Sequence, residues 1–485
     1  MAASADPGSV PGASTPGASA RPGCVEGAAS TGGRAQLLAS ERALFEARTP
    51  RSRSAYERAG RSMYGGVPMP WMLEWPNPYP LYARTARGNR IWDVDGNEYI
   101  DFCLGDTGSM FGHSPDVVVD AVTTQIPNGI TTMLASTDAA VVGELLTRRF
   151  GLPYWQLAMS ATDANRFVVR LSRVLTDRPK VLVFNGCYHG SLDEALVGLD
   201  AEGRLVKRAP TDTNPAWIAE RGAVVVEFND LAALDRVLAR RDVACVLAEP
   251  IMTNCGMVLP EPGYHDALRA LTREHGTYLV IDETHTLSCG YGGYTREHGL
   301  EPDFLVFGKA IAGGIPIAGY GFSADVEGAH RRMFGDGTAR IWGEMGIGGT
   351  LSGNAYSVAV LRAALERLAT PEAFDHMIRL GEQMADRLES VIRESGLGWS
   401  VTSAGARVEI QFTPDSPSTG GAALAAFDWD LVELSHLYLL NRGIVITPFH
   451  NMMLVSPATS EEDIETLAAG WAECVNALAL ATQEP

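Results

Sequence analysis

Four apolar segments of strand length are each followed, within a few residues, by side chains that can do chemistry. The segments are 180–184, 243–248, 277–281 and 304–307, and the side chains after them are Tyr188 with His189, Glu249, Asp282 and Lys309. Ligands of open α/β sheets bind beyond the carboxyl ends of the strands. An aromatic ring, two carboxylates and a lysine at one crevice therefore predict covalent chemistry on a carbonyl compound.

Lys309 is the candidate nucleophile. It follows the apolar segment 304–307 and Gly308, and the glycine-rich segment 310–316 comes after it. Desolvation in such surroundings favours the neutral amine, which attacks carbonyls and forms a Schiff base. The alternative is a surface lysine at a strand end.

Asp282 and Glu283 follow the apolar residues 278–281. A buried carboxylate needs a cationic partner. A protonated pyridine nitrogen would supply one, and the ion pair would keep the ring an acceptor of electrons. The alternative is a helix-start or surface pair.

Two Gly/Ser/Thr-containing segments precede helical stretches. Residues 159–165 lead into the helical segment 166–175, where they form either a plain N-cap or a phosphate site at the positive end of the helix dipole. Residues 346–354 also precede a helix, but no strand enters them and the G-x-G-x-x-G spacing is absent. A dinucleotide-binding Rossmann site is therefore rejected.

The elements that must position these residues alternate in type. Helical segments 230–240 and 265–274 lie between the apolar strands, which predicts an α/β fold with a mostly parallel sheet and helices on both faces. A hairpin at 90–102, turning at Asp95-Gly96, precedes this region. A helix at 371–394, a strand at 407–412 and a final helix from Glu461 onward predict a smaller α+β domain.

The predicted organisation has four parts. Residues 1–33, rich in Ala, Gly, Ser and Pro, form a disordered tail. Residues 34–105 pack with the small domain, residues 106–360 form the large domain, and residues 361–485 form the small domain. Two packed domains suit a chain of 485 residues.

Composition excludes several classes of partner. The formal net charge is −19, so nucleic acid is a poor partner, and no apolar run approaches the roughly 20 residues of a membrane helix. Seven scattered cysteines form no C-x-x-C pair, which indicates a reducing compartment, here the cytoplasm, and no metal site.

Taken in order, these motifs resemble the class III aminotransferases of the fold-type-I pyridoxal-phosphate (PLP) enzymes, in particular the branch that contains glutamate-1-semialdehyde aminomutase. The resemblance runs from about Gly65 to the last helix. Its motifs are D-x-D-G at 93–96, Gly112-His113-Ser114-Pro115, Tyr188-His189-Gly190, Glu249-Pro250, Asp282-Glu283, Gly308-Lys309 and Gly349-Thr350-Leu351-Ser352-Gly353-Asn354.

The resemblance implies PLP as cofactor, small amine and oxo-acid substrates, and a homodimer with shared sites. Lys309 would carry the Schiff base and shuttle a proton, and Asp282 would pair with the pyridine nitrogen. The other implied cofactor contacts are the ring neighbours Tyr188, His189 and Thr284, the phosphate ligands Ala161 and Thr162, the supporting Glu249, and Thr350 toward the phosphate of the neighbouring subunit.

Two departures from the family concern the cofactor site. Ala161 replaces the glycine of the family's S-G-T-E, which is tolerable where φ is negative. Thr284-His285 replaces the usual Val followed by Gln or Met. His285 then either hydrogen-bonds the phenolic oxygen of the cofactor or is a packed neutral histidine.

The third departure concerns the substrate. The family branch has an arginine in the segment matching 65–75, and many relatives have one in the segment matching 451–457; neither segment has one here. Trp71 and Met72 instead suggest an apolar wall, or else they pack a dimer core. Asp106 and Thr107 are candidate polar contacts at the entrance.

These observations favour an aminotransferase acting on a primary amine or non-α amino acid together with an oxo acid or aldehyde. Two alternatives stay open. One is a glutamate-1-semialdehyde-type aminomutase, which keeps the cofactor. The other is a non-catalytic PLP-binding regulator.

Overall fold

The computed structural model describes residues 32–207, 222–335 and 340–483. The predicted tail lies outside these ranges except for its last two residues, which already belong to helix α1 (Gly32–Arg48). Within the described ranges, no helix combines the length and apolar character that crossing a membrane requires.

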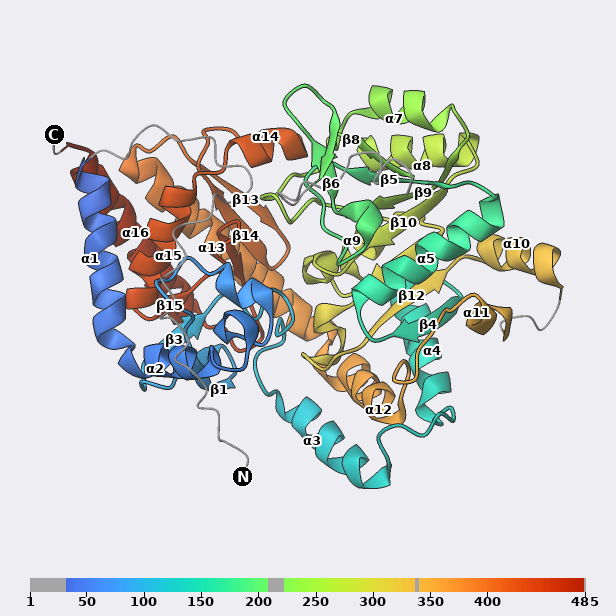
Figure 1. The fold of residues 1–485 in the computed structure, drawn as a ribbon, viewed down its shortest axis with the longest axis horizontal. Coiled ribbons are helices and arrows are strands. Elements are labelled where there is room, and N and C mark those ends of the chain that lie inside the picture. The colour runs from blue at the N-terminus through green and yellow to red at the C-terminus, as the bar shows by residue number, and fades with distance from the viewer. Residues whose placement is uncertain (1–31, 208–221, 336–339, 484–485) are drawn as a thin grey trace, which may run out of the picture.

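A seven-stranded sheet forms the core of the larger lobe (Figure 1). In spatial order its strands are β4 (Tyr154–Ala158), β12 (Ala318–Phe322), β11 (Phe304–Phe307), β10 (Tyr278–Asp282), β9 (Val243–Ala248), β5 (Lys180–Phe184) and β8 (Ala223–Val226). Neighbours from β11 to β8 pair in parallel, whereas β12 is antiparallel to both of its neighbours. The α/β prediction with a mostly parallel sheet is confirmed.

The four strands predicted to carry chemistry are adjacent in this sheet, in the order β11-β10-β9-β5. Three of them have the predicted bounds, and β10 is shifted by one residue, so that Asp282 is its last residue. Because the four strands are parallel neighbours, their carboxyl ends meet at one edge of the sheet.

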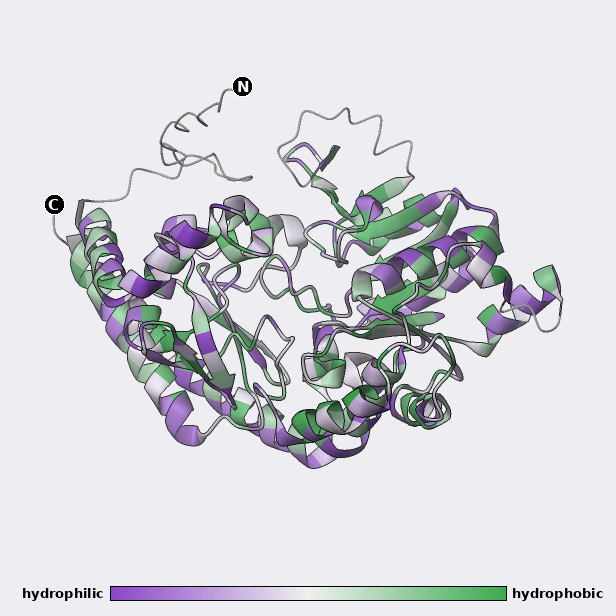
Figure 2. Ribbon diagram, turned by 60° about the horizontal axis from the view of Figure 1, so that its bottom comes forward, coloured by the Kyte–Doolittle hydropathy of each residue, from purple (hydrophilic) through white to green (hydrophobic). Residues whose placement is uncertain are grey.

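Burial on both faces explains why these strands are continuously apolar. In β11, Phe304 and Val306 belong to one hydrophobic cluster, while Leu305 and Phe307 belong to another. Figure 2 shows the central strands as hydrophobic and the covering helices as mixed in character. The helices of this lobe are α3 (Asp116–Gln125), α4 (Asp138–Phe150), α5 (Ala161–Thr176), α7 (Leu231–Leu238), α8 (Tyr264–Glu274), α9 (Gly293–Glu297), α10 (Ala324–Phe334), α11 (Arg340–Glu344) and α12 (Ala355–Ala363), and a small β-ribbon is formed by β6 (Val197–Leu199) and β7 (Leu205–Lys207).

The second lobe combines N-terminal and C-terminal segments of the described chain, and its helices α1 and α16 (Glu461–Gln483) lie side by side (Figure 1). Strands β1 (Ala83–Arg87), β2 (Arg90–Asp93) and β3 (Glu98–Asp101) include the predicted hairpin, and β3 pairs in parallel with β15 (Ile444–Val445). A second sheet contains β13 (Ser400–Ala404), β14 (Arg407–Gln411) and β16 (Met452–Leu454). The helices are α1, α2 (Pro50–Ala59), α13 (Pro371–Ser395), α14 (Gly420–Ala425), α15 (Trp429–Asn441) and α16 (Glu461–Gln483).

Candidate active site

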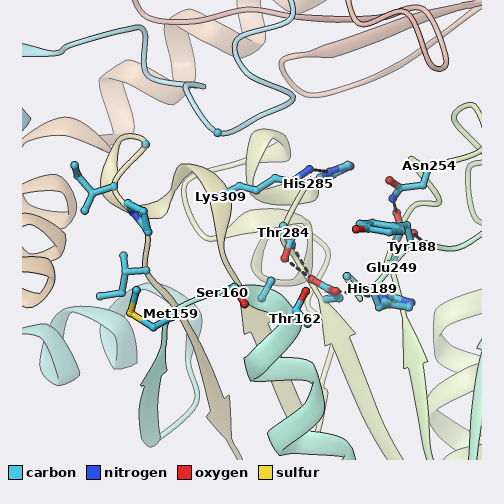
Figure 3. Close-up of a pocket in the computed structure, with 18 residues that line it drawn as sticks. Met159, Ser160, Thr162, Tyr188, His189, Glu249, Asn254, Thr284, His285 and Lys309 are labelled. Atoms are coloured by element: carbon cyan, nitrogen blue, oxygen red, sulfur yellow. Dashed lines mark hydrogen bonds and ion pairs between the residues drawn. The ribbon is translucent and has the colours of Figure 1, made fainter. Parts of the chain in front are cut away.

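A cavity of about 340 Å³ lies beyond the carboxyl ends of the four adjacent strands. This volume is within the range of small-molecule sites. Figure 3 shows the side chains that line it. The structure brings together here nine residues predicted for the site: Ala161, Thr162, Tyr188, His189, Glu249, Asp282, Thr284, His285 and Lys309.

Lys309 is the first residue of a 3-10 turn that directly follows β11 and Gly308. Its φ is +41°, a left-handed conformation that is sterically costly for a residue with a Cβ and is found mainly where function demands it. Its Nζ donates to Asp106 Oδ2 at 2.6 Å and also contacts His285 Nε2. The lysine therefore lies between a carboxylate and an imidazole, and Figure 3 shows its contact with the imidazole of His285.

Asp106 reaches Lys309 from a tight turn in the other lobe. Leu104, Asp106 and Thr107 all have positive φ, at 47°, 50° and 76°. The strain at the β-branched Thr107 is the least expected of the three. Burial alone would raise the pKa of Asp106, but the charge of Lys309 and the hydrogen bond from its Nζ outweigh it and hold this pKa well below its usual range. Asp106 is thus an anion that faces the lysine.

Asp282 lies at the end of β10 and is almost completely buried. Its Oδ2 accepts from Asn165 Nδ2 at 2.8 Å and pairs with His189 Nδ1 at 2.9 Å. Its Oδ1 accepts from the backbone N–H and hydroxyl of Thr284 at 3.1 and 2.6 Å. Burial alone would raise the pKa of Asp282, but the hydrogen bond and charge of His189 lower it below the ordinary value. The site thus holds a buried, ionised carboxylate.

The N-terminus of α5 forms one wall of the cavity. Ser160 is the N-cap and accepts from Asp163 N at 3.2 Å, while Ala161 and Thr162 begin the helix. Gly190, with φ +81°, allows the loop after Tyr188 to approach closely, because a Cβ there would lie 2.1 Å from Thr162 Oγ1. Ala161 is not among the residues with positive φ, so the condition set for replacing glycine is met.

These features match the chemical groups of PLP. The helix N-terminus offers free N–H groups and a positive dipole to a phosphate. Asp282 offers an anion to a pyridinium, and Lys309 offers an amine to an aldehyde. His189 Nε2 is buried and has no hydrogen-bond partner among the described residues, so the wall of the cavity retains an unused polar atom. The residues fit the cofactor.

Glu249 follows β9 and organises the loop around it. Its Oε1 accepts from Tyr188 N at 3.1 Å, and its Oε2 accepts from Thr253 N at 3.0 Å and from Asn254 Nδ2 at 2.9 Å. Glu249 thereby fixes the backbone that carries the Tyr188 ring. Neither Thr253 nor Asn254 was predicted from the sequence, since neither belongs to a motif.

An aromatic wall covers Tyr188. The Trp71 ring lies 5.2 Å from the Tyr188 ring and 5.6 Å from the Phe449 ring, centroid to centroid. Phe449 was not predicted, although it lies two residues before the segment searched for arginine. Met72 is 41% exposed and does not line the cavity. Trp71 therefore lies beside the site through its contact with Tyr188. Within a single chain, Met72 does not lie beside the site.

Thr107 and Thr350 lie away from the cavity. Thr107 is fully buried and accepts from Arg407 Nη2 at 2.7 Å. Thr350 is exposed. Neither of them lines the cavity, so Thr107 is not an entrance contact here, and its role is to hold Arg407.

Arg407 is the main residue that the sequence reasoning missed. It is 1% exposed, and its Nε and Nη1 have no hydrogen-bond partner among the described residues. Its Nη1 is 3.8 Å from Glu409 Oε1, which itself pairs with His450 Nδ1 at 3.0 Å. Arg407 is opposite Leu454 in the β14–β16 register. An arginine thus lies across the strand pair from the segment that lacks one.

Comparison with known proteins agrees with this geometry. Residues 73–474 match the family model described as Aminotransferase class-III. A glutamate-1-semialdehyde 2,1-aminomutase from Sorangium cellulosum (strain So ce56) is 32% identical over 446 residues, covering 89% of this chain and 97% of that protein.

Solved structures show the same likeness. A glutamate-1-semialdehyde-aminomutase from Pseudomonas aeruginosa PAO1, in complex with PMP, has a TM-score of 0.88 and 47% identity, and covers 92% of this chain and 98% of its own. A β-phenylalanine aminotransferase from Variovorax paradoxus has a TM-score of 0.80 and 26% identity, and covers 91% and 97%.

Proposed function

The chain belongs to the class III aminotransferases, a PLP-dependent family, and from that membership we propose that it moves an amino group between a primary amine or non-α amino acid and an oxo acid or aldehyde. When bound, PLP supplies an aldehyde that takes up the amino group and a ring that stabilises negative charge on the substrate carbon. The protein's own residues bind, orient and move protons around it.

Binding and orientation are assigned to five residues. Ala161 and Thr162 hold the phosphate through the N-terminus of α5. Asp282, kept ionised by its donors, pairs with the pyridine nitrogen. The Tyr188 ring covers one face of the cofactor and Thr284 lies at the other, as their positions around the cavity allow (Figure 3).

Proton movement is assigned to Lys309. The residue directly follows β11 and Gly308, and we propose that with PLP bound its Nζ would carry the proton that amino transfer requires. Asp106 Oδ2, at 2.6 Å from Nζ, holds the ammonium form in place. Supporting contacts come from His189 on Asp282 and from Glu249 on the backbone of Tyr188.

The observation that carries the choice of substrate is the aromatic wall of Trp71, Tyr188 and Phe449. Of these rings Tyr188 lines the cavity, and Trp71 and Phe449 extend from it as one aromatic surface, which favours an apolar substituent over a charged one. The segment 65–75, in which the family branch has an arginine, has none here, and its Met72 is exposed. A carboxylate-free amine is the donor that best matches this surface.

A second candidate is the aminomutase reaction, or transfer from an amino acid. It is favoured by the names of the relatives and by Arg407, a buried cation of which two nitrogens have no hydrogen-bond partner among the described residues. Arg407 is joined to the site through Thr107, the neighbour of Asp106. It is the candidate anchor for a substrate carboxylate, from a position the family motif does not use.

A half-reaction distinguishes the two candidates. An arylalkyl amine, a β-amino acid, an α-amino acid and a diamine are each added alone to the PLP-loaded protein, and the loss of visible cofactor absorbance is followed. Conversion by the carboxylate-free amines, weakened in Trp71→Ala and unchanged in Arg407→Met, is the expected result. Conversion by amino acids only, abolished in Arg407→Met, would overturn the amine proposal.

Turnover without any oxo acid tests the aminomutase directly. A lone amino aldehyde is supplied as substrate, and its rearranged product is measured. Turnover at a rate comparable with the half-reaction would replace the first proposal by the second. Bound cofactor that is inert toward every donor would instead support a non-catalytic regulator.

We also propose a homodimer with shared sites. Ile130, Met133, Leu134 and Leu351 are exposed, with Leu134 78% accessible, and Tyr356 N donates to Ile130 O, so the segments around 130 and 356 are neighbours. We propose that these two segments, the second of which includes Thr350, form the dimer contact. Leu134→Asp should shift the mass measured by light scattering from dimer to monomer and lower cofactor affinity, whereas an unchanged dimer would refute the assignment.

The cytoplasmic location stays a prediction.

A further inference from the structure

A chain of three buried side chains leads away from Lys309. His285 Nε2 contacts Lys309 Nζ, and His285 Nδ1 lies 2.8 Å from Thr253 Oγ1. Thr253 Oγ1 in turn lies 2.7 Å from Glu249 Oε2. Glu249, Thr253 and His285 are 5%, 1% and 5% exposed, so bulk water does not compete for these contacts.

The direction of each hydrogen bond follows from the number of protons available. Both oxygens of Glu249 already accept from N–H groups of the loop, so Glu249 is the acceptor for the Thr253 hydroxyl. A hydroxyl has one proton to donate. Because Thr253 gives that proton to Glu249, it can only accept from His285. The Nδ1 atom of His285 therefore carries hydrogen.

The other ring nitrogen then has a free lone pair. Burial, followed by the charge of Lys309, lowers the pKa of His285 well below its ordinary value, and the neutral ring with hydrogen on Nδ1 is an acceptor at Nε2. The charged or titratable groups that act on the ring are Lys309, Asp106, Arg407 and His450, with Glu249 acting through Thr253.

We propose that His285 is held in the Nδ1–H form by Thr253 and Glu249, and that its Nε2 accepts the proton that Lys309 must lose to act as a nucleophile. This proposal rests on the proposed function, since it assigns a second base to the same site. It makes His285 a partner of Lys309 and not a hydrogen-bond donor to the phenolic oxygen of the cofactor.

The step is balanced within the described residues. An N–H bond of the Lys309 ammonium breaks, its electron pair stays on Nζ, and the proton binds the Nε2 lone pair. The positive charge moves from Nζ to the ring. There it faces Asp106 Oδ2 at 3.8 Å and, through Nδ1–H and Thr253, the Glu249 carboxylate. As Lys309 becomes neutral, the repulsion that suppressed protonation of the ring disappears.

The first test uses the full-length protein with cofactor removed. ¹⁵N-histidine NMR, with the His285 signals assigned by their loss in His285→Gln, should show neutral His285 with hydrogen on Nδ1 near pH 7. Thr253→Val should shift the ring toward the Nε2–H form, and Thr253→Ser, which restores the hydroxyl, should restore the Nδ1–H form. A ring with hydrogen on Nε2 in the natural protein would overturn the proposal.

The second test measures the rate at which Lys309 of the cofactor-free protein captures added PLP, trapped with borohydride and quantified by mass spectrometry. A positioned base contributes on the order of 100-fold or more, so His285→Gln and Thr253→Val should slow capture by at least about tenfold at pH 7, with Thr253→Ser close to the natural protein. Equal rates in Thr253→Val and Thr253→Ser would refute the role of the relay. No capture by the natural protein would refute the proposed function itself, while the NMR result would still decide the tautomer.

Discussion

Replacing Asp282 by asparagine should destabilise the cofactor-free protein strongly, because the carboxylate is surrounded by donors. Asn165 and His189 point at Oδ2, and the backbone and hydroxyl of Thr284 point at Oδ1. An asparagine has one oxygen and one NH₂ group in these two positions. Whichever way it turns, two donors then face its NH₂ group, and His189 loses its counter-charge.

The magnitude follows from removing one member of a buried pair. Breaking such a pair costs about 3–5 kcal/mol, because the remaining charge stays buried without a partner. At about 2 °C per kcal/mol for a domain of this size, the unfolding temperature should fall by roughly 6–10 °C. The assay is thermal unfolding of the full-length protein without cofactor, at one protein concentration.

The effect of pH gives the prediction a second, independent outcome. Burial works against both charges, but the hydrogen bond and charge of His189 leave the pKa of Asp282 lowered. Cys187, together with the hydrogen bond and charge of Asp282, leaves the pKa of His189 raised well above its ordinary value. A lowered carboxyl pKa stabilises above about pH 4 and is lost as pH falls. A raised histidine pKa stabilises below about pH 6.5 and is lost as pH rises. The difference should therefore be largest between about pH 4 and 6.5.

The control is Asp386→Asn, on the exposed side of α13, which removes the same charge without removing a buried partner. It should unfold within about 1 °C of the natural protein, as surface substitutions usually do. If Asp282→Asn matched this control at pH 5.5, Asp282 would not be an ionised, paired carboxylate. The reasoning that assigns it to a pyridinium would then fail.

Three further outcomes are expected. Gly190→Ala should weaken PLP binding by at least about tenfold, since the new Cβ would lie 2.1 Å from Thr162 Oγ1, whereas Gly203→Ala, with φ +73° and open space around it, should leave titrated PLP affinity unchanged. Trp71→Ala should lower kcat/KM for an arylalkyl amine by roughly three- to tenfold, the value of one aromatic contact; an unchanged ratio would remove the ring from the substrate site. Lys309→Ala should abolish borohydride trapping of PLP, and retained trapping would identify another lysine as the anchor.

Strands buried on both faces were predictable because their apolar character is continuous over four to six residues. Segments 180–184, 243–248 and 304–307 match β5, β9 and β11 residue for residue. Strand β12 was not predicted, since Gly319 and Gly321 interrupt its apolar pattern. Those glycines are required by packing: a Cβ at Gly321 would lie 2.5 Å from the Trp155 ring. The cause is a contact with a residue 166 positions away, which local pattern does not reveal.

The cavity was predictable for a related reason. Parallel strands place their carboxyl ends together, so residues just after 184, 248, 281 and 307 had to converge wherever these strands are neighbours. Contacts made by loops outside the seven-stranded sheet were harder to predict from the sequence. Asp106 was expected near the entrance, but its contact with Lys309 depends on a turn in which the four consecutive residues 104–107 all have positive φ. The domain limits proposed from sequence remain predictions.

Arg407 shows most clearly why substrate preference is harder to predict than cofactor. A search for arginine in 65–75 and 451–457 tests two segments of the sequence. A substrate carboxylate instead binds whichever cation lies near it in the folded protein, wherever that cation lies in the sequence. Residues directly opposite each other on paired antiparallel strands extend to the same face of the sheet. Arg407 therefore extends to the same face as Leu454, which belongs to the second segment searched.

Arg407 is nevertheless not a free cation. Glu409 Oε1 lies 3.8 Å from its Nη1, and His450 shares that oxygen. A substrate carboxylate would have to displace Glu409 from Arg407, which would leave the buried Glu409 with His450 as its remaining partner. A carboxylate-free amine requires no such exchange. The local charges therefore favour the amine donor, and the comparison of Arg407→Met with Trp71→Ala on the same four donors measures which of the two surfaces selects the substrate.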